Sequence, residues 1–116
     1  ELALMQPQRF AALVPVCGGV TAPRAARDLT VTPLRGEADP YAALAQRLKH
    51  VPVWIFHGAR DDVVPPREDR LIEAAFRAAD GDARYTEFAD ADHNSWDPAY
   101  AQTPALWEWL FAQRRE

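Results

Sequence analysis

Two short segments of this sequence contain the residue types of a proton-transfer site. The stretch V-W-I-F-H-G-A-R-D-D-V-V-P-P, from Val53 to Pro66, places Asp61 and Asp62 just after an apolar run. The stretch D-A-D-H-N-S-W, farther along the chain, contains His93. A carboxylate that accepts a hydrogen bond from an imidazole fixes the tautomer of the ring and stabilises its protonated form. Asp61 and His93 together therefore have the chemistry of a general base.

Other polar and aromatic residues near these segments have simpler interpretations. We predict that His57 is a packed histidine bonded to a backbone carbonyl, and that His50 is a solvated residue at the end of a helix. Trp96 either lines a substrate pocket or packs against the final helix. His57, Asp61 and His93 are a conceivable set of metal ligands, but the sequence has no close ligand pair such as H-x-H or H-E-x-x-H. We therefore predict no metal and no cofactor.

The pattern of apolar residues predicts the elements that position these side chains. Helices are predicted to alternate with strands, an order that favours right-handed crossovers and a parallel sheet with helices on both faces. The predicted fold class is therefore α/β, a three-layer sandwich. The predicted strands are Phe10–Val16, Val51–Phe56 and Ala83–Phe88. One predicted helix ends near Pro7, and three others begin at Asp39-Pro40, Pro65-Pro66 and Thr103-Pro104.

The composition of each segment adds detail to this arrangement. The continuous apolar run Val51–Phe56 suits a strand covered on both faces, whereas the alternating run Ala83–Phe88 suits a place nearer the edge of the sheet. Gly81 is predicted to cap the preceding helix. The charged run P-P-R-E-D-R suits a helix N-terminus and needs no partner, and Thr21–Gly36 is predicted to be loop.

The last predicted helix has an apolar stripe at helical spacing. Its buried side is predicted to consist of Leu106, Trp107, Leu110 and Phe111, and Trp109 is predicted to be half exposed. Trp54, on the central predicted strand, is expected in the core.

The predicted topology places Asp61 and His93 at the same edge of the sheet. Ligands of open parallel sheets bind at the carboxyl ends of the strands, and each of these residues follows a neighbouring strand by a few positions. Adjacent strands lie about 4.8 Å apart, so a hydrogen bond between the two side chains is geometrically easy.

Size and charge exclude several classes of protein. The chain has 116 residues, a mass of 13.0 kDa and a formal charge of −4, with 13 Lys and Arg residues scattered rather than clustered. It has no electrostatic footprint for nucleic acid. No apolar run reaches the length of about 18 residues that a membrane span needs, and the first residues lack the layout of a signal peptide. One cysteine excludes an internal disulfide, and the cellular compartment stays unknown.

The two polar segments and an earlier one resemble segments of a known superfamily. H-G-A-R-D-D-V-V-P-P and D-A-D-H-N-S-W resemble the acid and histidine segments of α/β-hydrolases. The likeness is to bacterial esterases, polyhydroxybutyrate-depolymerase-like proteins and predicted peptidases of the prolyl-oligopeptidase and dienelactone-hydrolase kind. R-F-A-A-L-V-P-V-C-G-G is similar to the strand that follows the nucleophile helix in those enzymes. The resemblance covers nearly the whole chain.

The resemblance implies roles for individual residues. It implies that Asp61 is the catalytic acid and His93 the catalytic histidine, with Asp62 a neighbour that shapes the turn. The family has D-A-G-H where this sequence has Asp92 in place of the glycine. Since Asp tolerates left-handed backbone better than most residues, we expect the turn to be kept.

The nucleophile of such an enzyme is not found in this chain. The family's serine lies in G-x-S-x-G, upstream of the acid. Ser95 is the sole serine here and has no flanking glycine, and Cys17 has Pro15 where the turn of the nucleophile would need glycine. We therefore expect residues 1–116 to be the C-terminal part of one α/β-hydrolase domain, without its nucleophile-bearing half. Alone it should have little activity, and its first strand should expose an edge open to self-association.

The function predicted from these features is hydrolysis of carboxylic esters by Ser-His-Asp acyl transfer, with a small-molecule ester or peptide as substrate. A serine peptidase of the prolyl-oligopeptidase kind is the alternative reaction. A non-catalytic interaction module, which binds a partner through its open sheet edge, is an alternative of another class. A flavodoxin-like binder of small molecules is disfavoured because no Gly-rich phosphate loop follows a strand.

Overall fold

The computed structural model describes residues 2–20 and 31–114. In chain order the elements are α1 (Leu2–Met5), the 3-10 helix η1 (Thr32–Leu34), α2 (Pro40–Leu48), β1 (Val53–Gly58), α3 (Arg67–Ala78), β2 (Ala83–Phe88), α4 (Trp96–Ala101) and α5 (Pro104–Ala112). The α/β class and the parallel sheet flanked by helices are confirmed. The short helix α4 was not predicted. Among the described residues, no helix has the length and apolar character to cross a membrane.

Two of the three predicted strands form a regular sheet. β1 and β2 pair in parallel, with Val53 opposite Ala83 at one end and Gly58 opposite Phe88 at the other. All residues of β1 are buried, whereas β2 is only partly covered, as expected for a central and an edge strand.

The predicted strand Phe10–Val16 contacts β1 through two isolated parallel bridges rather than a continuous ladder. The Leu13 N–H donates to the Pro52 carbonyl, and the Leu13 carbonyl accepts from the Trp54 N–H. Two residues along, the Pro15 carbonyl accepts from the Phe56 N–H. The next bond of this register needs an N–H at position 15, which proline lacks. The segment therefore runs beside β1 without a complete ladder.

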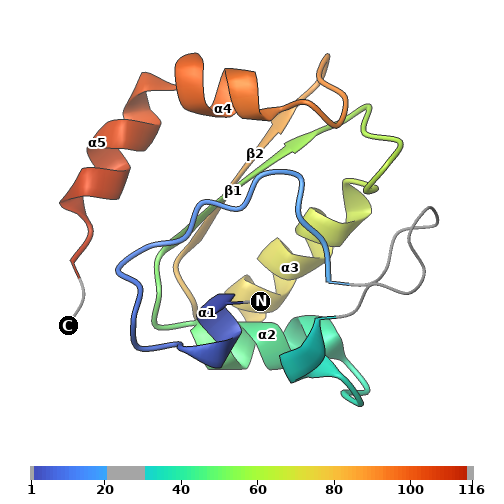
Figure 1. The fold of residues 1–116 in the computed structure, drawn as a ribbon, viewed down its shortest axis with the longest axis vertical. Coiled ribbons are helices and arrows are strands. Elements are labelled where there is room, and N and C mark those ends of the chain that lie inside the picture. The colour runs from blue at the N-terminus through green and yellow to red at the C-terminus, as the bar shows by residue number, and fades with distance from the viewer. Residues whose placement is uncertain (1, 21–30, 115–116) are drawn as a thin grey trace.

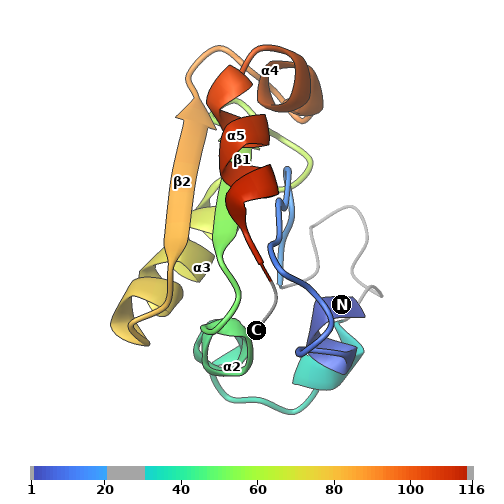
Figure 2. The same cartoon turned by 90° about the vertical axis from the view of Figure 1, so that its left-hand side faces the viewer.

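Alternate residues of β1 face two different apolar cores. Val53 and Ile55 pack with Ile72 and Phe76 of α3 on one face. Trp54 and Phe56 pack on the other face with residues of α4 and α5. Figure 1 shows α2 and α3 on one side of the strands and α4 and α5 on the other, and Figure 2 shows α5 passing across β1. This alternation places His57 on the same face as Val53 and Ile55, toward α3.

The face that α5 buries differs from the predicted one. Trp109 is 8% exposed, and its ring meets that of Trp54 edge to face with 5.6 Å between centroids. Trp107 and Phe111 are 40% and 77% exposed. Trp107 stacks on Phe111 and donates its indole N–H to the Tyr100 carbonyl. Leu106 and Trp109 of α5 face inward, in the same core as Ala99 of the unpredicted helix α4.

The ends of the helices show local chemistry that was partly expected. The Asp39 carboxylate accepts a hydrogen bond from the Ala42 N–H and caps α2. At the end of α3 the left-handed residue is Asp80, with φ of 59°, and not Gly81. Gly81 instead donates its N–H to the Phe76 carbonyl, the longer bond of a Schellman motif. Of the predicted loop Thr21–Gly36, residues 21–30 lie outside the described residues.

Candidate active site

The loops that follow β1 and β2 are bonded to each other through their backbones. Ala59 donates to the Phe88 carbonyl and Arg60 to the Ala91 carbonyl, both at 2.9 Å. A Cβ atom placed on Gly58 would lie 2.1 Å from the Asp92 carbonyl oxygen. The glycine therefore allows the second loop to lie against the end of β1.

Asp61 is held firmly at this junction. It is 6% exposed, and its Oδ1 accepts hydrogen bonds from the N–H groups of Val63 and Val64 at 2.9 and 2.8 Å. Burial acts to raise the pKa of the Asp61 carboxyl, but the bonds from His93 and these two amides outweigh it and lower that pKa. Asp61 is therefore an ionised, fixed hydrogen-bond acceptor at neutral pH.

His93 meets the second oxygen of the same carboxylate. Its Nδ1 lies 2.8 Å from Asp61 Oδ2. Its side chain is 38% exposed, and its Nε2 has no hydrogen-bond partner among the described residues. When Nδ1 carries the proton toward a carboxylate, Nε2 is left as the basic atom. His93 can therefore accept a proton at Nε2 from a group that approaches this unpartnered nitrogen.

Trp96 lies beside this histidine at the start of α4. The two rings meet edge to face, with 6.3 Å between centroids and 85° between planes. Trp96 is 45% exposed, so it is not buried in the core beneath α5.

Two acidic neighbours behave differently from expectation. Asp62 is exposed, and its side chain has no hydrogen bond in the described part of the chain; Asp61 itself accepts the N–H groups of the turn. Asp92 does not adopt the left-handed conformation, which among the described non-glycine residues belongs to Cys17 and Asp80. Its carboxylate instead accepts from the Asn94 N–H at 2.9 Å, which holds the loop with ordinary backbone angles.

His57 is fully buried and has two partners. Its Nε2 lies 2.8 Å from the Val64 carbonyl oxygen, the kind of contact predicted for it. Its Nδ1 lies 2.6 Å from Oδ2 of Asp69, which was not predicted. Asp69 lies in the run P-P-R-E-D-R, expected to be a charged helix N-terminus that needs no partner, yet Glu68 and Asp69 are 3% and 0% exposed. Helical spacing alone could have flagged Asp69, since it shares a face with the buried Ile72 and Phe76. His50, by contrast, is exposed and contacts the Pro7 carbonyl.

Cys17 and Ser95, the two residues considered as nucleophiles from the sequence, are hydrogen-bonded to each other. Cys17 Sγ lies 2.5 Å from Ser95 Oγ and 3.0 Å from the His93 carbonyl oxygen. Cys17 is 7% exposed and Ser95 is 0% exposed. Because both side chains are buried, neither is open to a substrate. Their hydrogen bonds to each other and to the His93 carbonyl stabilise the loop that contains His93.

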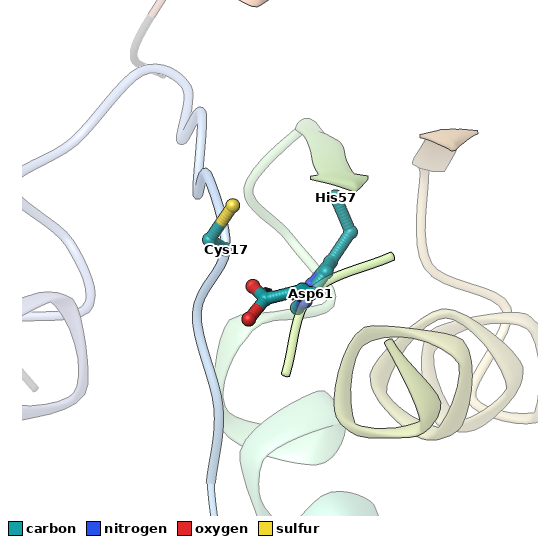
Figure 3. A group of neighbouring side chains, drawn as sticks. All are labelled: Cys17, His57 and Asp61. Atoms are coloured by element: carbon teal, nitrogen blue, oxygen red, sulfur yellow. Dashed lines mark ion pairs between the residues drawn. The ribbon is translucent and has the colours of Figure 1, made fainter. Parts of the chain in front are cut away.

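Cys17 also approaches His57 and Asp61 closely enough to suggest metal ligands. One ligand atom from each lies within 4.8 Å of the others, and Figure 3 shows the Asp61 carboxylate directed toward the segment that carries Cys17. However, His57 Nε2 faces two acceptors, Val64 O at 2.8 Å and Asp61 Oδ2 at 3.1 Å. It therefore carries a proton rather than a free lone pair, and the group does not fit a metal as it stands.

Comparisons with known proteins place this geometry in context. No protein-family model matches the sequence, and no curated protein matches it significantly. Among solved structures, a thermostable esterase is similar with a TM-score of 0.72 and 29% identity, over 96% of this chain and 26% of that one. A Klebsiella pneumoniae protein described as a dienelactone hydrolase is similar in fold, with a TM-score of 0.58 and 18% identity, over 96% of this chain and 45% of that one. The chain thus spans less than half the length of either protein.

Proposed function

Because the chain has the α/β-hydrolase fold of the solved structures that it resembles, we propose that it supplies the acid and the histidine of a serine esterase. The observation that carries the proposal is the 2.8 Å contact between Asp61 Oδ2 and His93 Nδ1, with Nε2 of His93 left open. The 29% identity to a thermostable esterase supports an ester rather than a peptide as substrate. The serine belongs to a segment outside these 116 residues, in the same domain.

The reaction follows from the proton positions. His93 Nε2 removes the proton of the serine hydroxyl as its oxygen attacks the ester carbonyl, and then gives that proton to the departing alcohol. Water, deprotonated by the same Nε2, then attacks the acyl carbonyl, and the acyl–serine bond breaks as Nε2 returns that proton to the serine oxygen and the carboxylic acid is released. Asp61 stabilises the imidazolium formed in each half of the reaction. Trp96 borders the place where the acyl or alcohol group binds.

A serine-directed fluorophosphonate and peptide mass spectrometry test this proposal. The polypeptide that contains both this chain and the serine-bearing segment should hydrolyse a p-nitrophenyl ester and carry the label on a serine outside residues 1–116. The 116-residue chain alone should be unlabelled and no faster than its His93→Ala variant. Labelling of Ser95, or a rate from the isolated chain that depends on His93, would contradict the proposal.

A second histidine of the chain, His50, provides a matched control for His93. His93→Ala should abolish hydrolysis by the longer polypeptide, whereas His50→Ala should keep it, because His50 is exposed and its ring bonds the Pro7 carbonyl on the surface. Equal effects of the two substitutions would show that His93 has no special role.

A further inference from the structure

Four side chains form a continuous series of polar contacts from α3 to the partly exposed ring of His93: two hydrogen bonds joined by one ion-pair contact between His57 and Asp61. Asp69 Oδ2 lies 2.6 Å from His57 Nδ1, and His57 Nε2 lies 3.1 Å from Asp61 Oδ2. That same oxygen lies 2.8 Å from Nδ1 of His93. The two histidines therefore meet at one oxygen of Asp61, while its other oxygen accepts two backbone N–H groups.

The contacts of His57 determine where its protons lie. Nε2 faces the Val64 carbonyl and Asp61, and Nδ1 faces the Asp69 carboxyl, so both nitrogens face oxygen atoms. Two protonation states satisfy these contacts: an imidazolium between two carboxylates, or a neutral ring whose Nδ1 accepts from a protonated Asp69. Nε2 carries a proton in both states. The Asp69–His57 pair thus holds a proton that a free imidazole would release near neutral pH.

The surroundings of this pair favour retention of that proton. His57 and Asp69 are 0% exposed, and Asp69 Oδ1 has no hydrogen-bond partner among the described residues. No lysine or arginine of the described chain forms an ion pair with Asp61 or Asp69. Burial acts to lower the pKa of His57, but its bonds to Asp69 and Val64 outweigh burial and raise it. Burial also raises the pKa of Asp69.

We propose that His57 and Asp69 are positioning residues of the esterase site. The Nε2–H of His57 donates to the carbonyl of Val64, whose own N–H holds Oδ1 of Asp61. The same Nε2 lies 3.1 Å from Oδ2 of Asp61 and stabilises by ion pairing the orientation that accepts from His93, while Asp69 fixes the ring of His57 in this position. The inference rests on the proposed function, since the geometry it maintains is that of the catalytic pair. Neither residue touches the substrate, so each acts only through Asp61.

Steady-state hydrolysis by the longer polypeptide tests the effect on the reaction. The double variant His57→Phe/Asp69→Leu removes the donor and the buried carboxyl together, which avoids leaving a charge without a partner. We expect kcat to fall about 10- to 100-fold, as for other groups that orient a reacting residue, with KM unchanged. His57→Gln keeps an N–H donor and should recover most of the lost rate. Equal rates in the double variant and the parent would overturn the proposal.

Nuclear magnetic resonance on the 116-residue chain tests the geometry without any ester. At neutral pH the ¹⁵N shift of His57 Nε2 should be that of a protonated nitrogen, and the Nδ1 proton of His93 should resonate far downfield and exchange slowly. The downfield signal should persist in His57→Gln and disappear in the double variant while its amide spectrum stays dispersed.

The ¹⁵N shift of His57 in the unsubstituted chain tests the proposal even where the double variant does not fold. An unprotonated Nε2 of His57 would overturn the proposal directly, as would an unchanged His93 signal in a folded double variant. Because these signals need no serine, an absence of esterase activity would contradict the proposed function and leave this test intact.

Discussion

His93 Nδ1 lies 2.8 Å from Asp61 Oδ2, although the two residues are 32 positions apart in the sequence. Each belongs to a loop at the carboxyl end of one of two paired parallel strands. The carboxylate is oriented independently of His93, since Oδ1 is held by the N–H groups of Val63 and Val64. The site is therefore preorganised, which is what proton transfer by a histidine requires.

In the longer polypeptide, Asp61→Asn should abolish most of the proposed esterase activity and keep the fold. The amide oxygen can still accept from the Val63 and Val64 N–H groups, but the amide nitrogen then faces His93 Nδ1 and favours the wrong tautomer. By analogy with the same change in a serine protease, we expect kcat to fall about 10⁴-fold. Asp62→Asn is the matched control, because that side chain is exposed, and it should keep the parent rate. A loss in both variants would assign the effect to the loop rather than to the acid.

Gly58→Ala should separate the two loops of the site. The added Cβ would lie 2.1 Å from the Asp92 carbonyl oxygen and 2.5 Å from that of Ala91, both of them backbone atoms. Overpacking of this kind costs about 1–3 kcal/mol or more, and it should displace His93 as well. Urea denaturation and the ester assay measure the two effects. Gly18→Ala, whose Cβ would lie 3.9 Å from Pro15 Cβ, should change little.

Trp109→Ala should destabilise the fold far more than Phe111→Ala. The Trp109 ring is 8% exposed and packs on Trp54, whereas Phe111 is 77% exposed. Loss of a buried tryptophan costs about 3–5 kcal/mol, and an exposed substitution stays within about 0.5 kcal/mol. Chemical denaturation of both variants gives the comparison. Similar losses would mean that α5 presents both residues to the sheet.

Stability should decrease as the pH rises above that at which a free histidine titrates. The pKa of His57 is raised in the native state, from an ordinary value of 6.5. The native state therefore binds this proton more tightly than the unfolded chain, and the resulting stabilisation is complete below pH 6.5 and lost as the pH rises through the raised pKa. Urea denaturation from about pH 6 to pH 9 should show this decline. His57→Gln should show a flatter dependence; an identical slope would exclude His57 as its origin.

Much of the fold could be predicted from local patterns in the sequence. β2 has the predicted bounds, β1 is shifted by two residues from its prediction, and α2 begins at the predicted proline. These features depend on side-chain periodicity and on proline and capping chemistry, which act within a few residues. The contact between Asp61 and His93 could also be predicted from the sequence, because parallel strands bring their carboxyl ends to one edge of the sheet.

Features that depend on contacts between distant elements could not be predicted in this way. Four apolar residues on α5 fit a helical stripe, but which of them face inward depends on how α5 packs against β1 and α4. The third strand lacks a full ladder because Pro15 falls at a position that must donate, and only the register with β1 reveals that.

The sequence by itself determined the alternation of helices and strands, and the two loops from which the site is built. Helical spacing could place Asp69 on the buried face of α3, but only the tertiary structure decided that its partner there is His57. The physical reason is that burial of a charge depends on the partner that compensates it. That partner lies 12 residues away on a strand, where no local pattern connects the two.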